Sequence, residues 1–225
     1  MSCSRRNFVS GMGAGALILM TGKPAQSLAQ TLTINEVRYG MLHDEKLCIG
    51  CTACMDACRE VNNVPEGVSR LEIIRGEPQG EFPDVTYEFY RHSCQHCSNA
   101  PCVHVCPTGA SFIEASTGIV DVKADLCVGC QYCIAVCPYR VRFIHPKTKA
   151  ADKCNFCRDT NLAKGRLPAC VEVCPTKALT FGNLDDPNSE ISRQLREKQV
   201  YQTKVELGTK PNLYHVPAKA GEIRR

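Results

Sequence analysis

Several kinds of residue and motif are scarce in this sequence of 225 residues. Tryptophan is absent and aromatic residues make up only 6% of the chain, so much of the core must consist of something other than large side chains. No phosphate-binding loop, dinucleotide motif or nucleophile paired with a base is present, which argues against a self-contained catalyst. No segment after the first thirty residues is apolar enough to span a membrane.

Excess charge of one sign is lacking as well. Three basic residues, Arg5, Arg6 and Lys23, precede Gln30, and no acidic residue does. The rest of the chain carries 24 basic and 23 acidic residues, a net charge of +1. The sequence therefore predicts no basic field that would attract nucleic acid or acidic lipid.

Cysteine, by contrast, is abundant. The chain has seventeen cysteines, an odd number that disulfide pairing alone would not use up. The cysteines of exported proteins normally form disulfides, and the N-terminus has the pattern of an export signal. Something other than disulfides must therefore hold the sulfurs.

The export signal is predicted over residues 1–29. A twin-arginine pair, Arg5 and Arg6, is followed by a weakly apolar run from Gly11 to Met20 and a cleavage point after Ala29. The run is too short for a membrane anchor. A twin-arginine (Tat) signal exports proteins already folded, so metal clusters could be inserted before export to the periplasm. Cys3 lies before the arginines and has no assigned role.

The other sixteen cysteines fall into four motifs of four. These are Cys48, Cys51, Cys54 and Cys58 in CIGCTACMDAC; Cys94, Cys97, Cys102 and Cys106 in CQHCSNAPCVHVCP; Cys127, Cys130, Cys133 and Cys137 in CVGCQYCIAVCP; and Cys154, Cys157, Cys170 and Cys174 in CNFC and CVEVCP. None is left over.

Motifs one and three have the C-x2-C-x2-C-x3-C spacing of bacterial ferredoxins. Three thiolates spaced by two residues can reach three iron corners of a [4Fe-4S] cluster, and the fourth, one helical turn further on, can reach a neighbouring cluster. Proline follows the fourth cysteine at Pro107, Pro138 and Pro175, whereas motif one has Arg59 there. A structural zinc site would leave the third and fourth cysteines unexplained, and a disulfide scaffold fits the spacing even less well. Iron-sulfur ligation is therefore the favoured interpretation.

Two further elements follow from local pattern. The sequence between motifs two and three predicts a β-hairpin that turns at Ser116–Gly118. After the last motif, a short helix is expected to begin near Asn188 or Ser189 and to place Ile191 and Leu195 one turn apart. The hairpin favours pairing of motifs two and three, with one and four nested around them, but pairing of one with two and three with four stays open.

Together, the motifs, the strings CPTGASF, CVGCQYC and DKCNFC, and the C-terminal GTKPNLY resemble the four-cluster ferredoxin subunits of bacterial respiratory complexes. This family includes the iron-sulfur subunits of DMSO and polysulfide reductases and those of formate-dependent nitrite reduction. The resemblance covers almost the whole chain. It implies an α+β fold of two ferredoxin-like two-cluster modules that hold four [4Fe-4S] clusters, with a signal and a C-terminal extension.

The resemblance also implies the nested set of ligands. Carried onto this sequence, one cluster has Cys48, Cys51, Cys54 and Cys174; its neighbour has Cys58, Cys154, Cys157 and Cys170; a third has Cys94, Cys97, Cys102 and Cys137; and the fourth has Cys106, Cys127, Cys130 and Cys133. The expected divisions are 1–29 for the signal, 30–93 for motif one and an insertion, 94–138 for the central module, 139–180 for motif four and 181–225 for the extension.

By this resemblance the protein is an electron carrier and not itself an enzyme. Electrons would enter from a quinol-oxidising membrane subunit and leave toward a c-type cytochrome that reduces nitrite. A role as the electron-transfer subunit of a molybdopterin oxidoreductase is the main alternative. A structural zinc protein that acts as an interaction module is a less favoured one. The C-terminal extension could either pack over the modules or dock on the membrane partner.

Residues beside the ligands have two interpretations. Basic residues adjacent to the motifs could raise cluster potentials or could simply be solvated; they are Arg59, Arg140, Arg142, Lys153 and Arg158. Apolar residues that alternate with ligands are expected to exclude water; they are Ile49, Val128, Ile134 and Val136. His96 and His104 lie inside motif two and are expected to be bystanders, because four cysteines are already present there.

Overall fold

The computed structural model describes residues 37–219, so the predicted export signal lies outside the described part of the chain. The elements in chain order are β1 (Tyr39–Asp44), α1 (Ala53–Val61), β2 (Leu71–Arg75), β3 (Phe89–Ser93), α2 (Pro101–His104), β4 (Ser111–Ile113), β5 (Val120–Val122), α3 (Tyr132–Ala135), β6 (Phe143–Ile144), β7 (Ala151–Asp152), the 3-10 turn Leu162–Lys164, α4 (Ala169–Glu172), β8 (Leu179–Asn183), α5 (Glu190–Glu197), the 3-10 turn Val205–Leu207 and β9 (Leu213–Val216). Short helices and small sheets of this kind agree with the expected α+β class.

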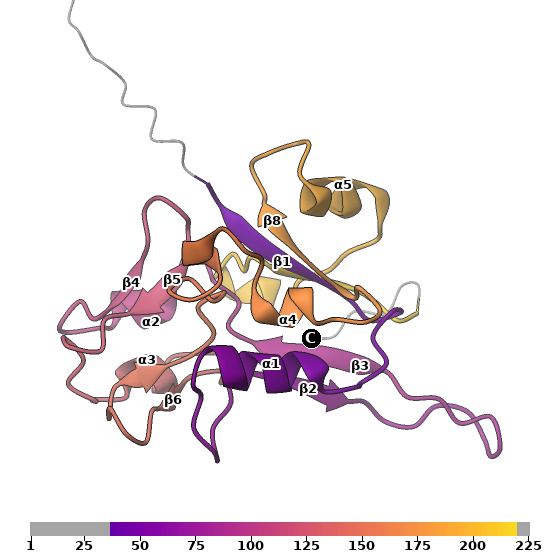
Figure 1. The fold of residues 1–225 in the computed structure, drawn as a ribbon, viewed down its shortest axis with the longest axis horizontal. Helices are drawn as coiled ribbons and strands as arrows, with labels where there is room; N and C mark the ends of the chain where they lie inside the picture. Colours follow the sequence, from indigo (N-terminus) through magenta and orange to yellow (C-terminus); the bar gives the residue numbers. More distant parts are fainter. Residues whose placement is uncertain (1–36, 220–225) are drawn as a thin grey trace, which may run out of the picture. The chain divides into compact units, whose positions relative to one another are not determined.

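One three-stranded sheet joins the two ends of the described chain. β1 lies in the middle, antiparallel to β8 and parallel to β9, and the three strands run side by side in Figure 1. Met41 of β1 is paired with both Phe181 and Leu213, and Met41 and Leu213 are fully buried. Because β1 leads into motif one and β8 follows motif four, this sheet holds the first and last motifs together.

Three two-stranded antiparallel sheets complete the strand pairing. β4 and β5 form the hairpin predicted around Ser116–Gly118, which is thereby confirmed. β6 pairs with β7 between motifs three and four, and β2 pairs with β3 within the insertion that separates motifs one and two. β4–β5 and β6–β7 are short hairpins between cysteine motifs, whereas residues 76–88 form a longer connection between β2 and β3.

The helix predicted after the last motif is α5. The Ser189 hydroxyl accepts a hydrogen bond from the backbone N–H of Ser192 at 3.2 Å and so caps the first turn. Ile191 is fully buried and packs in a small apolar cluster with Leu42 and Val216, against which Leu195 also packs. The C-terminal extension therefore packs onto β1 and β9 within the described residues.

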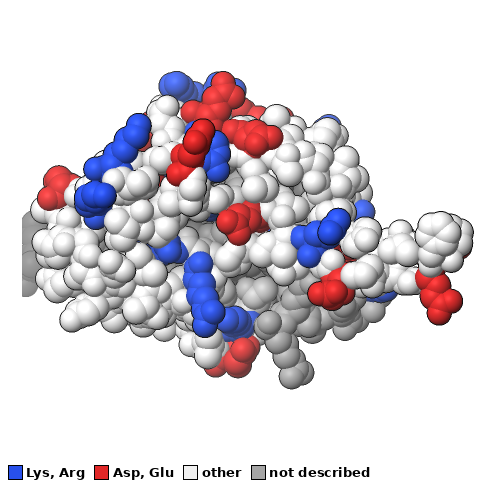
Figure 2. Space-filling view, turned by 90° about the horizontal axis from the view of Figure 1, so that it is seen from below, with Lys and Arg blue, Asp and Glu red and all other residues white. Residues whose placement is uncertain are grey.

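The main core consists in large part of cysteine. Eight of its twenty buried residues are cysteines, and large aromatic side chains are few, as the composition predicts. On the face shown in Figure 2, basic and acidic side chains are interspersed and much of the surface carries no charge, so this face shows no concentrated basic patch.

Candidate cluster-binding sites

In all four motifs, the residue before the second cysteine has a left-handed backbone. Its φ is 71° at Gly50, 45° at His96, 68° at Gly129 and 55° at Phe156. Glycine adopts this conformation freely, whereas the other two residues do so at a cost of about 1–2 kcal/mol each. The same turn therefore recurs in every motif and curls the chain around its sulfurs, even where no glycine marks it.

The third cysteine of each motif lies in a helix that starts just after this turn, at a proline or directly after one. Cys54 lies in α1, Cys102 in α2, Cys133 in α3 and Cys170 in α4. All four are buried. The turn and the helix together point three sulfurs of a motif toward one volume.

Three cavities are each bordered by four cysteines, three from one motif and one from another. The first quartet is Cys48, Cys51, Cys54 and Cys174; the third quartet is Cys94, Cys97, Cys102 and Cys137; the fourth quartet is Cys106, Cys127, Cys130 and Cys133. The single cysteine in each quartet is the fourth cysteine of its own motif, as the ferredoxin spacing predicts.

The second quartet is Cys58, Cys154, Cys157 and Cys170. Burial is the larger cause of the raised pKa of Cys58, and the nearby sulfurs of the other three cysteines raise it further. The four sulfurs of this quartet therefore lie close together. The side-chain amide of Asn62 lies 3.8 Å from the sulfur of Cys58 and 3.3 Å from that of Cys157. α1 and α4 pack against each other here, which brings Cys58 to motif four.

Burial keeps the thiols of Cys94, Cys97 and Cys170 protonated unless a metal binds them. It raises the pKa of Cys94 to about 12, and it raises the pKa of Cys97 and of Cys170 to about 11. Thiolates crowded in such surroundings require a compensating positive charge, and iron supplies it. The donor set of four closely spaced thiols therefore fits an iron-sulfur cluster.

A buried hydrogen-bond donor supports the same fit at the first quartet. His43 borders the cavity of this quartet and is fully buried. Its Nδ1 accepts a hydrogen bond from the backbone N–H of Arg91 at 3.3 Å, so the ring proton is assigned to Nε2. This Nε2–H has no hydrogen-bond partner among the described residues. An N–H group of this kind suits a cluster sulfide as acceptor.

The basic residues named beside the motifs differ widely in environment. Lys153 and Arg142 are buried, with 1% and 6% of their surface exposed. Arg140 is exposed, Arg59 donates to backbone oxygens at Val64, Pro65 and Val68, and Arg158 forms ion pairs with Asp121, Asp159 and Glu114.

Arg91 was not identified from the sequence, although it is buried and its Nη2 lies 3.9 Å from the sulfur of Cys154. It lies on β3 outside every motif, and the contact spans 63 residues, so no local pattern could indicate it.

The two histidines of motif two have other partners. His96 Nδ1 accepts the backbone N–H of Val120 at 3.2 Å, and its ring stacks on Phe156 with centroids 3.6 Å apart. The Nε2 atom of His104 lies 3.0 Å from the side-chain oxygen of Asn99. Both contacts fit the expectation that these residues are not ligands.

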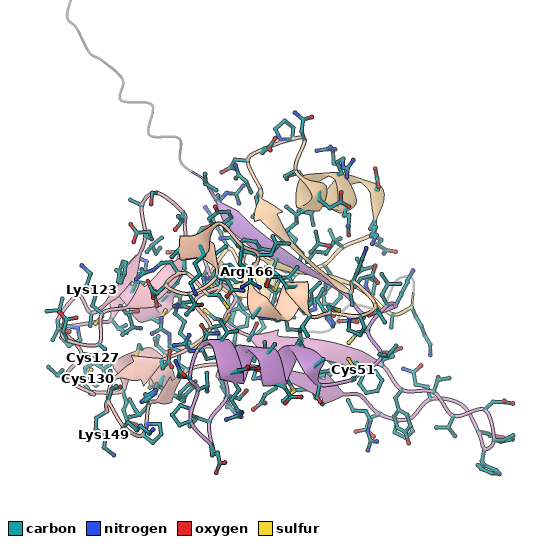
Figure 3. All side chains as sticks on the ribbon, viewed as in Figure 1. Cys51, Lys123, Cys127, Cys130, Lys149 and Arg166 are labelled. Carbon is teal, nitrogen blue, oxygen red and sulfur yellow. The ribbon has the colours of Figure 1, made fainter. Side chains whose placement is uncertain are left out.

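Of the sixteen motif cysteines, two are exposed, Cys51 of the first quartet and Cys130 of the fourth. Figure 3 shows Cys51 beside α1 on one side of the described unit, with Cys127 and Cys130 on the opposite side. Ile49 and Val128, which were expected to exclude water, border the cavities of the first and fourth quartets but are 60% and 69% exposed. Ile134 and Val136 do pack against the core.

Comparison with known proteins assigns the cofactor. Two models of a 4Fe-4S dicluster domain match residues 47–110 and 85–184. The protein NrfC of Escherichia coli strain K12 is 72% identical over 223 residues, which cover 99% of both sequences. An NrfC homologue of Haemophilus influenzae is 70% identical over 99% of both sequences, and the polysulfide reductase B subunit of Wolinella succinogenes is 55% identical over 83% of this chain and 97% of its own length. The prediction of four [4Fe-4S] clusters is confirmed. Among residues 37–219, no helix is both long and apolar enough to cross a membrane.

Proposed function

This chain belongs to the family of NrfC iron-sulfur proteins, and on that premise we propose that it is an exported electron carrier of nitrite respiration. Electrons enter from a quinol-oxidising membrane subunit of the NrfD type and leave toward a c-type cytochrome nitrite reductase system. The protein acts in the periplasm at the inner membrane, holds no substrate and performs no catalysis of its own. Each bound [4Fe-4S] cluster supplies one-electron chemistry.

The position of the exposed cysteines carries this proposal. Cys51 and Cys130 lie on opposite sides of the described unit, and the sulfurs between them are mostly buried (Figure 3). Apolar side chains, Ile49 and Val128, are exposed beside them. A series of clusters that carries electrons needs an accessible cluster at each end and an interior shielded from solvent, and this arrangement provides both.

We also propose that the sixteen cysteines bind the clusters in the nested ligand sets. Each quartet takes three cysteines from one motif and one from another, so motifs one and four form an outer module and motifs two and three a central module over residues 94–138. The side chains that border the three cavities and the Asn62 contacts support these sets. The rival scheme would require Cys58 to lie with motif two, whereas α1 packs on α4.

A role in a molybdopterin oxidoreductase is the second candidate. The polysulfide reductase B subunit and the thiosulfate reductase electron transfer subunit PhsB of Salmonella typhi, at 55% and 56% identity, favour it. The higher identity to NrfC over nearly the whole chain favours the nitrite pathway.

Anaerobic stopped-flow mixing tests the function. The holoprotein, reduced with dithionite and freed of excess reductant, is mixed with an oxidised multi-haem c-type nitrite reductase, and haem reduction is followed in the visible spectrum. Rapid, saturable haem reduction is expected. Absence of transfer to the cytochrome, combined with transfer to a molybdopterin subunit, would favour the second candidate.

The ligand sets are tested by Cys174→Ser and Cys48→Ser. The nested scheme places these two residues on one cluster, whereas the rival scheme places Cys174 with motif three, so both variants should perturb the same EPR signal, each with iron loss confined to about one cluster. Perturbation of two different signals would show that the nested assignment is wrong.

A further inference from the structure

Two arginines are buried inside the protein with no carboxylate beside them. Arg91 is 2% exposed and Arg142 is 6% exposed. Within residues 37–219, neither forms a salt bridge with an acidic side chain. An unpaired buried charge costs several kcal/mol, so another group must supply the negative charge.

Arg91 lies between the first and second quartets. Its Nη2 is 3.9 Å from the sulfur of Cys154, and its Nε donates to the hydroxyl of Ser93 at 2.9 Å. Burial lowers the pKa of Arg91, but Cys170, Cys154 and Cys54 together raise it above its usual value. Cys54 belongs to the first quartet, and the other two cysteines belong to the second.

Arg142 holds the corresponding place between the third and fourth quartets. It borders the cavity of the third quartet, and its Nη2 donates to the hydroxyl of Ser111 at 3.0 Å. Ser111 borders the cavity of the fourth quartet, and its backbone N–H donates to the sulfur of Cys106 at 3.3 Å. Arg142 is therefore adjacent to both cavities.

Lys153, the third buried cation, differs because its charge is already paired. Its Nζ lies 3.3 Å from a carboxylate oxygen of Asp121 and also binds the backbone oxygen of Val120. Among residues 37–219, Arg91 and Arg142 are therefore the buried cations that have ligand sulfurs but no carboxylate as negative neighbours.

We propose that Arg91 is the shared counter-charge of the first and second clusters and Arg142 that of the third and fourth. The proposal rests on the ligand sets given under the proposed function. A [4Fe-4S] cluster with four thiolates carries about −2 when oxidised and about −3 when reduced, so a nearby cation favours the reduced form. One cation between two clusters raises both potentials and offsets the repulsion between electrons held on neighbouring clusters.

Potentials measured on the intact holoprotein test the proposal. Arg91→Met and Arg142→Met are compared with wild type by EPR-monitored redox titration, and iron and acid-labile sulfide are measured on each sample. Arg91→Met should lower two of the four couples, each by at least tenfold in its reduction equilibrium constant, or about 59 mV for one electron, and leave the other two unchanged. Arg142→Met should lower the complementary two.

Arg140→Met is the matched control. Arg140 is exposed two residues before Arg142, so all four couples should stay at their wild-type values. A shift of a single couple, or of all four equally, in either buried variant would overturn the proposal. Electron delivery to a cytochrome is measured separately, so failure here leaves the proposed function standing.

A lysine variant keeps the test decisive if a methionine variant assembles poorly. Arg91→Lys retains the charge and should keep both couples within tenfold of wild type, whereas Arg91→Gln should lower both. Equal shifts in the two variants, or equal loss of clusters in both, would indicate a packing role and overturn the proposal.

Discussion

Replacing Gly50 by alanine should loosen the first cluster cavity selectively. Gly50 lies between Cys48 and Cys51 with a φ of 71°, where a side chain costs about 1–2 kcal/mol. An added Cβ would also lie 2.4 Å from the ring of Phe89, and overpacking of this kind costs about 1–3 kcal/mol more. The expected total is therefore about 2–5 kcal/mol.

Gly109 provides the matched control for the backbone part of this cost. Its φ is 67°, but a Cβ there would meet nothing within 4 Å. Gly109→Ala should therefore cost only the backbone term of about 1–2 kcal/mol. The difference between the two variants measures the clash with Phe89.

Cluster loss in urea under anaerobic conditions provides the assay, because it is irreversible and is best expressed as a rate. The broad absorption near about 400 nm is followed in both variants. Gly50→Ala should lose absorption about 5- to 150-fold faster than Gly109→Ala, since the clash of about 1–3 kcal/mol separates them and each 1.4 kcal/mol corresponds to about tenfold. The first EPR signal to disappear should be the one that Cys174→Ser perturbs.

A double-mutant cycle tests the cause. In a Phe89→Ala background the clash partner is gone, so adding Gly50→Ala should cost no more than Gly109→Ala does. Equal rates for the two glycine variants, or an unchanged Gly50→Ala effect without the Phe89 ring, would refute the steric reasoning.

Three further outcomes are expected. Removal of iron by a chelator and reductant should unfold the protein, seen as loss of far-UV circular dichroism, because eight of the twenty main-core residues are cysteines; a fully folded apoprotein would contradict this. Asn62→Leu removes the amide near Cys157 and Cys58 and should lower the reduction potential of one cluster, measured by EPR, with the iron content unchanged. Unchanged potentials would show that the amide does not influence the cluster. Ser189→Ala should reduce stability by about 1 kcal/mol through loss of the cap on Ser192, measured by urea-induced cluster loss, and Ser189→Asn should restore it.

Local patterns in the sequence were sufficient for much of this site. The first three motifs, the hairpin at Ser116–Gly118 and the capped helix α5 each depend on residues within about a dozen positions, and motif four on two such pairs of cysteines, so spacing and capping chemistry decide the structure. The sequence signal was weaker for the recurring turn, because Gly50 and Gly129 are recognisable whereas His96 and Phe156 adopt the same conformation without being glycine.

Contacts distant in sequence could not be derived in the same way. β9 pairs with β1 across most of the chain, and nothing in the spacing of the C-terminal residues specifies that register. Arg91 reaches Cys154 across 63 residues, from a strand that carries no ligand. Exposure was not derivable either, because Ile49 and Val128 were expected only to exclude water, and the structure shows that they border two cavities while most of their surface is exposed.

Shared side chains indicate the order of the quartets in space. Arg91 is adjacent to the first and second quartets, and Arg142 is adjacent to the third and fourth. Lys153 directly precedes Cys154 of the second quartet, and its Nζ binds the backbone oxygen of Val120, which borders the third cavity. The order is therefore first, second, third, fourth. Because the exposed cysteines belong to the first and fourth quartets, an electron that enters at either exposed end would, on the proposed ligand sets, cross the whole interior, with a cation at every step between neighbours.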